Sequence, residues 1–522
     1  MTTKASFLKF HVTPTVLLGL SLLVAPCAEA SGVKVLEPRL STVKPTTPEL
    51  DEETPVQRLV VKFHEGTRVR LRGGVMRILS EERDLDERGR MQRQHITDVR
   101  LSTDVSELQR IVDRQSRWGR PVRLFRDPEY TLAERKYLAE ERSGKEMADL
   151  DLYYELPLEP GMQAADVNEL VMQLNALDSV EIAYAEPVSW TASVSAWDVH
   201  GNATANYELR QGYLDAAPGG IDARYAWTVP GGRGKGVRLV DVEGAWNNRH
   251  EDLPVFFYLG GEQFQDVEWR DHGTAVMGVM VGQDNGYGIT GIAHEASAGR
   301  QGIATQSMAS AIQHAARAAG RGGVVLVELQ APGPKAMKSC ACNVSQCNYV
   351  PLEYWRANFD AIAQATAHGV HVVEAAGNGG ADLDDPAYRG AFDRAHRDSG
   401  AILVGASSAN GRTPMCWTNH GSRVDVHSWG EKVVTLGFGD LSGLGEHRGY
   451  TGSFNGTSSA APIVAGAVAA IQGAAFAAGK GPVDPRAMRA LLRTTGTPQA
   501  PSSKHIGPQP NLRRALQQVL SR

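Results

Sequence analysis

The sequence predicts an α/β protein in which a small α+β domain precedes a doubly wound, mostly parallel sheet. Two patterns carry this prediction. From residue 236 onward, short apolar strands alternate with helices, which is typical of a parallel sheet with helices on both faces. Before residue 188, two helical patterns alternate with four strand patterns in the order β-α-β-β-α-β.

The bulk composition is that of a globular protein with more than one domain. A chain of 522 residues has room for about three domains. Its 22% charged and 42% hydrophobic residues are ordinary values. The net charge is −5 and no long basic run occurs, so we expect no binding to nucleic acid.

Residues 1–30 are expected to be a secretory signal peptide. Lys4 and Lys9 precede an apolar run over residues 16–25, and Ala28-Glu29-Ala30 is typical of a cleavage site. The alternative is a membrane anchor, but the run is shorter than the ~18 residues that a span needs. We therefore expect a secreted protein, extracellular or periplasmic, with no membrane association after signal removal.

The next segments are taken in chain order. Residues 31–56 are rich in Pro, Thr and Glu, which predicts a disordered leader. Residues 57–187 are predicted to form a ferredoxin-like domain. Its expected strands lie at 58–63, 121–125, 152–156 and 180–185, its helices at 105–112 and 167–177, and a solvated helix is inserted at 132–149. A polar linker with a processing site follows at 188–210, before the large domain at 211–522.

The large domain is predicted to be organised around a buried helix that begins near Ser458. Residues 463–478 are almost all Ala, Val, Ile and Gly, so this helix is apolar on nearly every side. Ser458 stands at its N-terminus, where free N–H groups favour negative charge. Such a serine is either a plain helix cap or a nucleophile whose own N–H helps to hold an oxyanion.

Two upstream positions supply the partners that a nucleophilic serine needs. The apolar strand at 236–241 ends on Asp241, and His272 opens a second apolar helix. An acid that orients a histidine, which in turn activates a serine, is the logic of a catalytic triad.

The order Asp, His, Ser, with Asp-His-Gly-Thr at 271–274 and Asn-Gly-Thr-Ser-x-Ala-x-Pro at 455–462, resembles the subtilisin-like serine proteases over about residues 211–520. The resemblance implies a subtilisin-like fold and a serine endopeptidase that works through an acyl-enzyme. It makes Ser458 the nucleophile, His272 the general base and Asp241 the orienting acid.

Two further positions bear on this resemblance. Asn378, in Ala-Ala-Gly-Asn at 375–378, is implied to complete the oxyanion hole. At the acid, the chain has Asp241-Val242-Glu243-Gly244 where the family has Asp-Ser/Thr-Gly, and Glu243 is therefore a rival for the acid role.

The strand at 328–334 matches the family's substrate-binding strand by its position between motifs, and it is expected to pair with the backbone of an extended peptide. The implied substrate-binding residues are Gln330, Ala331, Pro332 and Gly333. Pro332 stands where the family commonly has glycine. The insertion that follows, at 335–349, is expected to border the cleft.

A structural calcium is implied by His-Glu-Asp-Leu at 250–253, which resembles the family's His-Pro-Asp-Leu. Asp252 and Asn285, in the loop at 283–289, would supply oxygen ligands. The alternative is that Asp252 is a solvated surface acid. No cofactor is expected for catalysis.

Four of the five cysteines lie after the predicted signal peptide, which in an exported chain predicts two disulfides with three possible connectivities. The competing interpretation is a zinc site, but its usual Cys-x2-Cys spacing is missing. The four residues are Cys340, Cys342, Cys347 and Cys416.

The resemblance also implies that residues 57–187 are an inhibitory propeptide and that the chain is a self-processing zymogen. Its partners would be protein or peptide substrates and its own propeptide, and we expect a monomer. An unrelated α+β binding module is the alternative for this domain.

Three other functions are alternatives for the whole chain. An α/β-hydrolase esterase needs Gly-x-Ser-x-Gly, which is missing, and a sedolisin-like peptidase lacks the histidine motif. A catalytically inactive relative that acts as a binding protein would be favoured by a missing triad residue.

Overall fold

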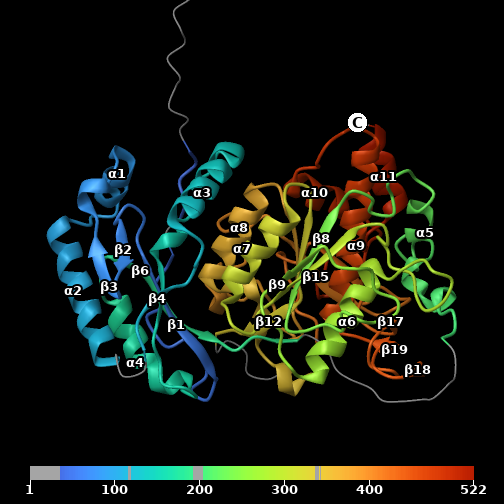
Figure 1. The fold of residues 1–522 in the computed structure, drawn as a ribbon, viewed down its shortest axis with the longest axis horizontal. Coiled ribbons are helices and arrows are strands. Elements are labelled where there is room, and N and C mark those ends of the chain that lie inside the picture. The colour runs from blue at the N-terminus through green and yellow to red at the C-terminus, as the bar shows by residue number, and fades with distance from the viewer. Residues whose placement is uncertain are drawn as a thin grey trace, which may run out of the picture.

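The computed structural model describes residues 36–40, 42–115, 119–191, 204–334, 340 and 342–521. The predicted signal peptide therefore lies outside the described residues, as does the part of the predicted linker at 192–203. The chain forms two domains that pack side by side, a smaller N-terminal one in blue and teal and a larger one from green to red (Figure 1).

The N-terminal domain is an antiparallel sheet whose strand order, β4-β5-β1-β6, is that of the predicted ferredoxin-like sandwich. The strands are β1 (Val56–Phe63), β4 (Val122–Arg123), β5 (Tyr153–Leu156) and β6 (Val180–Pro187), and the helices between them are α2 (Asp98–Gln115) and α4 (Ala164–Asn175). A hairpin of β2 (Val69–Arg72) and β3 (Val75–Ile78) and helix α1 (Leu85–Arg93) are inserted before α2.

Two expectations for this domain differ from the structure because the larger domain covers one of its surfaces. The alternation in β1 predicts a half-buried strand, yet every residue from 58 to 63 is buried. The charged helix predicted at 132–149 is α3 (Glu129–Ser143), and one side of it packs against α8 (Arg356–Ala367), while Tyr130 and Tyr137 on α3 are exposed.

The larger domain contains a seven-stranded parallel sheet in the order β16-β15-β14-β11-β8-β10-β9. Its strands are β8 (Arg238–Glu243), β9 (Tyr258–Gly260), β10 (Ser297–Gly302), β11 (Val324–Val327), β14 (His371–Ala375), β15 (Ile402–Ser407) and β16 (Val426–Trp429). With helices on both faces, this is the doubly wound α/β fold that the sequence predicts.

Alternate residues of the central strands face the two helical layers. Val325 and Val327 belong to the core that includes α7 (Met308–Ala319) and α8, and Leu326 belongs to the core around α9 (Thr457–Ala477). The remaining helices are α5 (Ala223–Ala226), α6 (Val267–Val281), α10 (Pro485–Thr495) and α11 (Leu512–Ser521).

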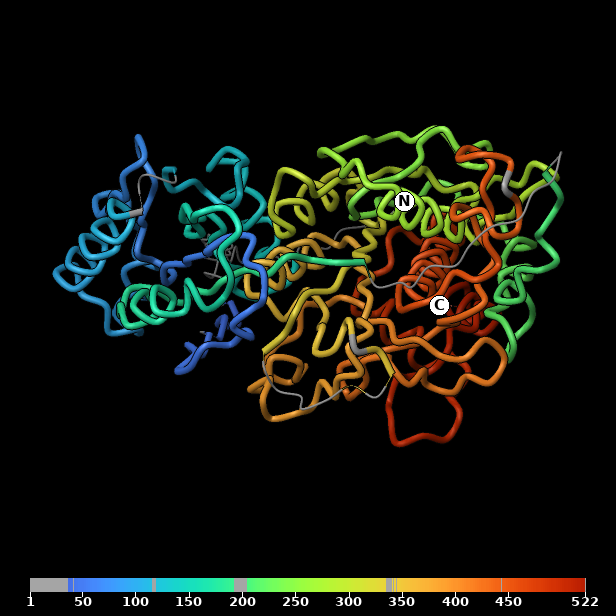
Figure 2. Tube along the Cα trace, turned by 90° about the horizontal axis from the view of Figure 1, so that it is seen from below, coloured from blue at the N-terminus to red at the C-terminus, as the bar shows by residue number. Residues whose placement is uncertain are grey.

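Two small sheets complete the larger domain. One joins β12 (Leu329–Pro332) to β13 (Tyr349–Pro351) and to β7 (Trp190–Thr191), and the other joins β17 (Val433–Leu436), β18 (Ser442–Gly443) and β19 (Gly449–Phe454). Figure 2 shows the segment after β6, near the change from teal to green, crossing from the N-terminal domain into the larger one.

Among the described residues, α9 is the one helix long and apolar enough to cross a membrane, but it lies in the centre of the larger domain and is almost wholly buried.

The close packing around α9 depends on glycine. A methyl group on Gly473 would come within 2.3 Å of the Gly231 carbonyl oxygen, so the loop can approach the helix only without side chains.

The cysteines form two disulfides, Cys340–Cys347 and Cys342–Cys416, as predicted for an even number of cysteines. The second one ties the insertion after β12 to the loop after β15.

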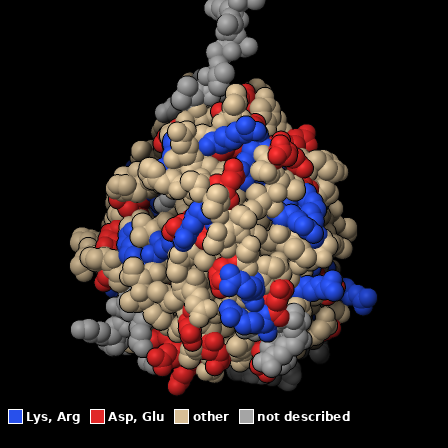
Figure 3. All heavy atoms as spheres, turned by 90° about the vertical axis from the view of Figure 1, so that its left-hand side faces the viewer, with Lys and Arg blue, Asp and Glu red and all other residues tan. Residues whose placement is uncertain are grey.

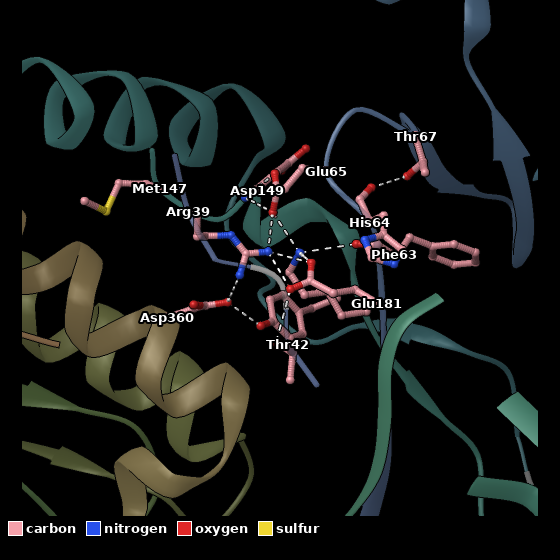
Figure 4. A network of polar contacts seen from close by, with 12 residues as sticks. Arg39, Thr42, Phe63, His64, Glu65, Thr67, Met147, Asp149, Glu181 and Asp360 are labelled. Atoms are coloured by element: carbon pink, nitrogen blue, oxygen red, sulfur yellow. Dashed lines mark hydrogen bonds and ion pairs between the residues drawn. The ribbon is translucent and has the colours of Figure 1, made fainter. Parts of the chain in front are cut away.

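The two domains meet at a buried network of charges that includes part of the predicted leader (Figure 4). Arg39 pairs with Glu181 of β6 at 2.5 Å, and Lys62 of β1 donates to the same carboxylate at 2.6 Å. From the larger domain, Asp360 of α8 lies 3.9 Å from Arg39 and accepts a hydrogen bond from the Tyr153 hydroxyl at 2.5 Å. The segment around Arg39 is therefore packed rather than disordered.

The opposite face of the N-terminal domain, turned away from the larger domain, carries interspersed acidic and basic side chains (Figure 3). Because acidic and basic side chains alternate over this face, it has no extended electrostatic potential of one sign.

Asp360→Asn should loosen the contact between the domains, because it leaves buried cations with one anion fewer. Removing one partner of a buried ion pair costs on the order of 3 kcal/mol. In urea unfolding of the Ser458→Ala chain, which lacks the expected nucleophile, Asp360→Asn should lower the free energy of unfolding by about this amount. The matched control is Asp284→Asn, at an exposed position. Equal stability of the two variants would contradict the role of Asp360.

Candidate active site

Ser458 is the second residue of α9 and is fully buried. The turn before it needs glycine, because Gly456 caps the helix with a φ of 100°, in the left-handed region. No described atom forms a hydrogen bond of ordinary geometry with the Ser458 hydroxyl, which lies close to the buried Glu328 carboxyl group. A buried hydroxyl without such a hydrogen bond costs free energy, which is unusual for a plain helix cap and typical of a reactive group.

His272 lies in the second turn of α6, which packs against α9. Its ring stands edge-on to Phe454, four residues before Ser458, with centroids 5.5 Å apart. The ring nitrogen Nε2 is buried and has no described partner. Burial lowers the pKa of His272 to about 4, and the charge of Asp241 opposes this shift. The imidazole is therefore neutral near pH 7, as a general base must be.

The carboxylate that contacts His272 is Glu243, whose Oε2 lies 2.8 Å from Nδ1. The sequence motif assigns this position to Asp241, which instead accepts a hydrogen bond from Trp246 Nε1 at 2.7 Å. Strand β8 continues to Glu243, two residues beyond its predicted end, and side chains two apart point to the same face of a strand. Both acids thus lie on the same face of β8, but Glu243 is the one that contacts His272 of α6.

Glu328, between β11 and β12, is a third buried carboxyl group near Asp241 and Glu243. Burial raises its pKa well above the usual range, as do the charges of Asp241 and Glu243, while the nearby Ser458 hydroxyl lowers it. Burial likewise raises the pKa of Asp241 and of Glu243 well above normal. Glu328 belongs to none of the sequence motifs, although an acid next to an apolar strand is a signal of a functional role.

Asn378 lies directly beside the N-terminus of α9. Its Oδ1 accepts hydrogen bonds from the Thr457 N–H at 2.9 Å and from the Thr457 hydroxyl at 3.0 Å. This leaves its NH2 group as a donor, and Nδ2 donates to Gln346 Oε1 at 3.2 Å. An amide donor next to the N–H groups of a helix start is the arrangement that can hold an oxyanion.

Strand β12 holds Gln330, Ala331 and Pro332 of the predicted substrate-binding residues, and Gly333 follows it. Its first half pairs antiparallel with β7, with Leu329 opposite Thr191 and Gln330 opposite Trp190. Its second half pairs with β13, and the Gly333 N–H donates to the Asn348 carbonyl. A segment from upstream of the larger domain thus lies along this strand in an extended conformation.

The residues predicted to bind calcium are in contact, but through an amide hydrogen bond. Asp252 accepts from Asn285 Nδ2 and from the Ile289 N–H, both at 2.8 Å. Burial raises the pKa of Asp252 to about 7, so it is not a solvated surface acid. An ionised carboxylate has about four acceptor sites, so these hydrogen bonds leave room for a cation and the calcium site stays a prediction. Within the described ranges, no group of three His, Cys, Asp or Glu side chains is arranged to hold a metal ion.

Comparison with known proteins identifies relatives of the larger domain. Residues 260–509 match the Subtilase family. Subtilisin Savinase of Lederbergia lenta is 28% identical over 250 residues, which are 46% of this chain and 77% of that protein. An alkaline protease of Alkalihalobacillus alcalophilus is also 28% identical over 250 residues, which are 46% of this chain and 54% of that protein. The major intracellular serine protease of Bacillus subtilis is 27% identical over 269 residues, 48% of this chain and 73% of that protein.

Among solved structures, a protease of Pseudoalteromonas arctica aligns with 61% of this chain and 100% of its own, at 20% identity and a TM-score of 0.44. A cold adapted subtilisin-like serine proteinase aligns with 54% of this chain and 89% of its own, at 20% identity and a TM-score of 0.38.

The region that matches the Subtilase family contains His272, Asn378 and Ser458, and because it begins after β8 it includes neither Asp241 nor Glu243. These matches show that the larger domain is similar to the subtilisin-like serine proteases, and they support a serine endopeptidase.

Proposed function

We propose that the protein is a secreted endopeptidase with the triad Ser458, His272 and Glu243, made as a zymogen that processes itself. The observation that carries the triad is the buried hydrogen bond between His272 Nδ1 and Glu243 Oε2. Ser458 lies at the start of α9, which packs against the helix that carries His272. Glu243 takes the acid role in place of Asp241.

In the proposed reaction, His272 Nε2 accepts the proton of the Ser458 hydroxyl while Oγ attacks the carbonyl carbon of the substrate. Glu243 accepts a hydrogen bond from Nδ1–H, which keeps Nε2 free as the base and stabilises the imidazolium that forms. The Ser458 N–H and the Asn378 NH2 group hold the oxyanion. His272 then protonates the leaving amine, and a water molecule hydrolyses the acyl-enzyme by the same steps in reverse.

The proposed substrates are extended peptide segments that add a strand to β12. The pairing of β7 with β12 supports this, since β7 lies where such a substrate would bind. It also supports the proposal that residues 57–187 are a propeptide whose tail occupies the cleft. A preformed partner of this kind would assist the folding of a large parallel sheet, which must close many long-range contacts.

Secretion and the monomeric state are parts of the same proposal. The features that support secretion are the predicted signal peptide at residues 1–30 and the two disulfides, which persist in oxidising compartments.

Exchange of the two acids for their amides separates their roles. Glu243→Gln should lower kcat by about 10⁴-fold, since an amide can stabilise the wrong histidine tautomer. Asp241→Asn keeps an oxygen that can accept from Trp246, and it should lower kcat less than about tenfold. Steady-state hydrolysis of a peptide substrate by both variants is the measurement. A larger loss in Asp241→Asn would return the acid role to Asp241.

Self-processing requires the nucleophile, so Ser458→Ala should accumulate at the full size that remains after signal removal. The wild type should yield a fragment that starts between residues 192 and 204, because the paired tail extends to Thr191 and Thr204 already contacts Glu251 of the larger domain. N-terminal sequencing and mass spectrometry of both purified proteins measure this. Maturation of Ser458→Ala in the absence of other proteases would rule out self-processing.

The calcium site predicted at Asp252 and Asn285 is part of the same proposal. Because a cation that binds only the native state stabilises it by mass action, millimolar calcium should raise the melting temperature of Ser458→Ala protein and chelator should lower it. Thermal unfolding in both conditions is the measurement, and equal melting temperatures would contradict the site.

A further inference from the structure

The insertion after β12 brings an additional amide side chain into the cleft. The disulfide Cys340–Cys347 closes a short loop that carries Gln346, and Cys342–Cys416 fastens the same loop to the body of the domain. The side chain of Asn343 donates to Gln346 Oε1 at 2.9 Å and holds it from within the loop. Gln346 is therefore fixed at the border of the cleft by covalent and polar contacts.

Two glutamines donate to the same backbone carbonyl of the segment that lies in the cleft. Gln346 Nε2 is 3.0 Å from the carbonyl oxygen of Thr191, and Gln330 Nε2 is 3.3 Å from it. A carbonyl oxygen has two lone pairs, so it can accept both hydrogen bonds at once. The contact is to the main chain, which every peptide presents.

Each of these glutamines also accepts a hydrogen bond from Asn378. The Asn378 N–H donates to Gln330 Oε1 at 2.8 Å, and Asn378 Nδ2 donates to Gln346 Oε1 at 3.2 Å. Because the oxygen of each glutamine amide accepts a hydrogen bond from Asn378, its NH2 group is turned toward the peptide carbonyl. The carbonyl subsite and the residue beside Ser458 are thus linked through both side chains.

We propose that Gln346 is a specificity-determining residue, which together with Gln330 binds the backbone carbonyl of the substrate residue opposite Leu329. This rests on the proposed function, in which a substrate takes the position of β7. In an antiparallel pairing, the next substrate residue lies opposite Glu328, beside Ser458, so the bound carbonyl precedes the one that reacts. The subsite selects extended peptides over substrates that carry only the reacting carbonyl.

Two substrates test this proposal on the mature enzyme. A peptide with the sequence of residues 184–205 offers the carbonyl, whereas an amino-acid ethyl ester with a free amino group has no carbonyl before the reacting one. Gln346→Ala should lower kcat/KM for the peptide about three- to tenfold, which is the effect of one hydrogen bond, and should leave the ester unchanged within about twofold. Gln346→Glu keeps the size of the side chain but loses the donor, so it should lower kcat/KM for the peptide at least as much.

The matched control is Gln517→Ala, the same exchange at an exposed position in α11. It should retain wild-type kinetics with both substrates. If Gln346→Ala and Gln346→Glu lost activity equally on peptide and ester, or lost none on the peptide, the proposal would be overturned. If the wild-type enzyme cleaved neither substrate, the proposed function itself would fail, which is a distinguishable result.

Discussion

Most of the active-site geometry depends on one constraint, the burial of α9. A helix that is apolar on nearly every side is stable only in the centre of a domain, so the parallel sheet and the other helices are arranged around it. Its N-terminus then lies near the carboxyl ends of the strands, where Glu243 and Glu328 stand and where Asn378 follows β14. The serine meets its partners because the strands end where the helix begins.

The same burial brings a cluster of acids together, and it limits how many of them can be ionised. Three carboxyl groups, Asp241, Glu243 and Glu328, share a region closed to solvent, and each has a raised pKa for this reason. Like charges in such a place repel strongly. The group that gains most from ionisation is the one that faces a developing imidazolium, which is the position of Glu243 against His272.

Sequence patterns predicted the fold well because the spacing of apolar residues reflects which side chains are buried. The alternation of strands and helices and the apolar helix after Ser458 express constraints that act locally, and the even number of cysteines predicted disulfides without predicting which cysteines pair. The choice between Asp241 and Glu243 could not be made in this way, since residues two apart in a strand share a face and only the point where β8 ends separates them. Arg39 and Gln346 were also missed, because their partners lie far away in the sequence.

The apolar core has a consequence for the behaviour of the protein over time. One continuous core joins the N-terminal domain to α7 and α8, and at its edge Tyr184 stacks on Trp355 with centroids 5.3 Å apart. Separating the domains wets both halves of this contact, and wetting apolar surface is costly. Cutting the chain and losing the N-terminal domain are therefore different events. After the first cut, the cleaved N-terminal domain would stay bound and the complex would still be inactive. Peptidase activity would therefore appear only after a lag.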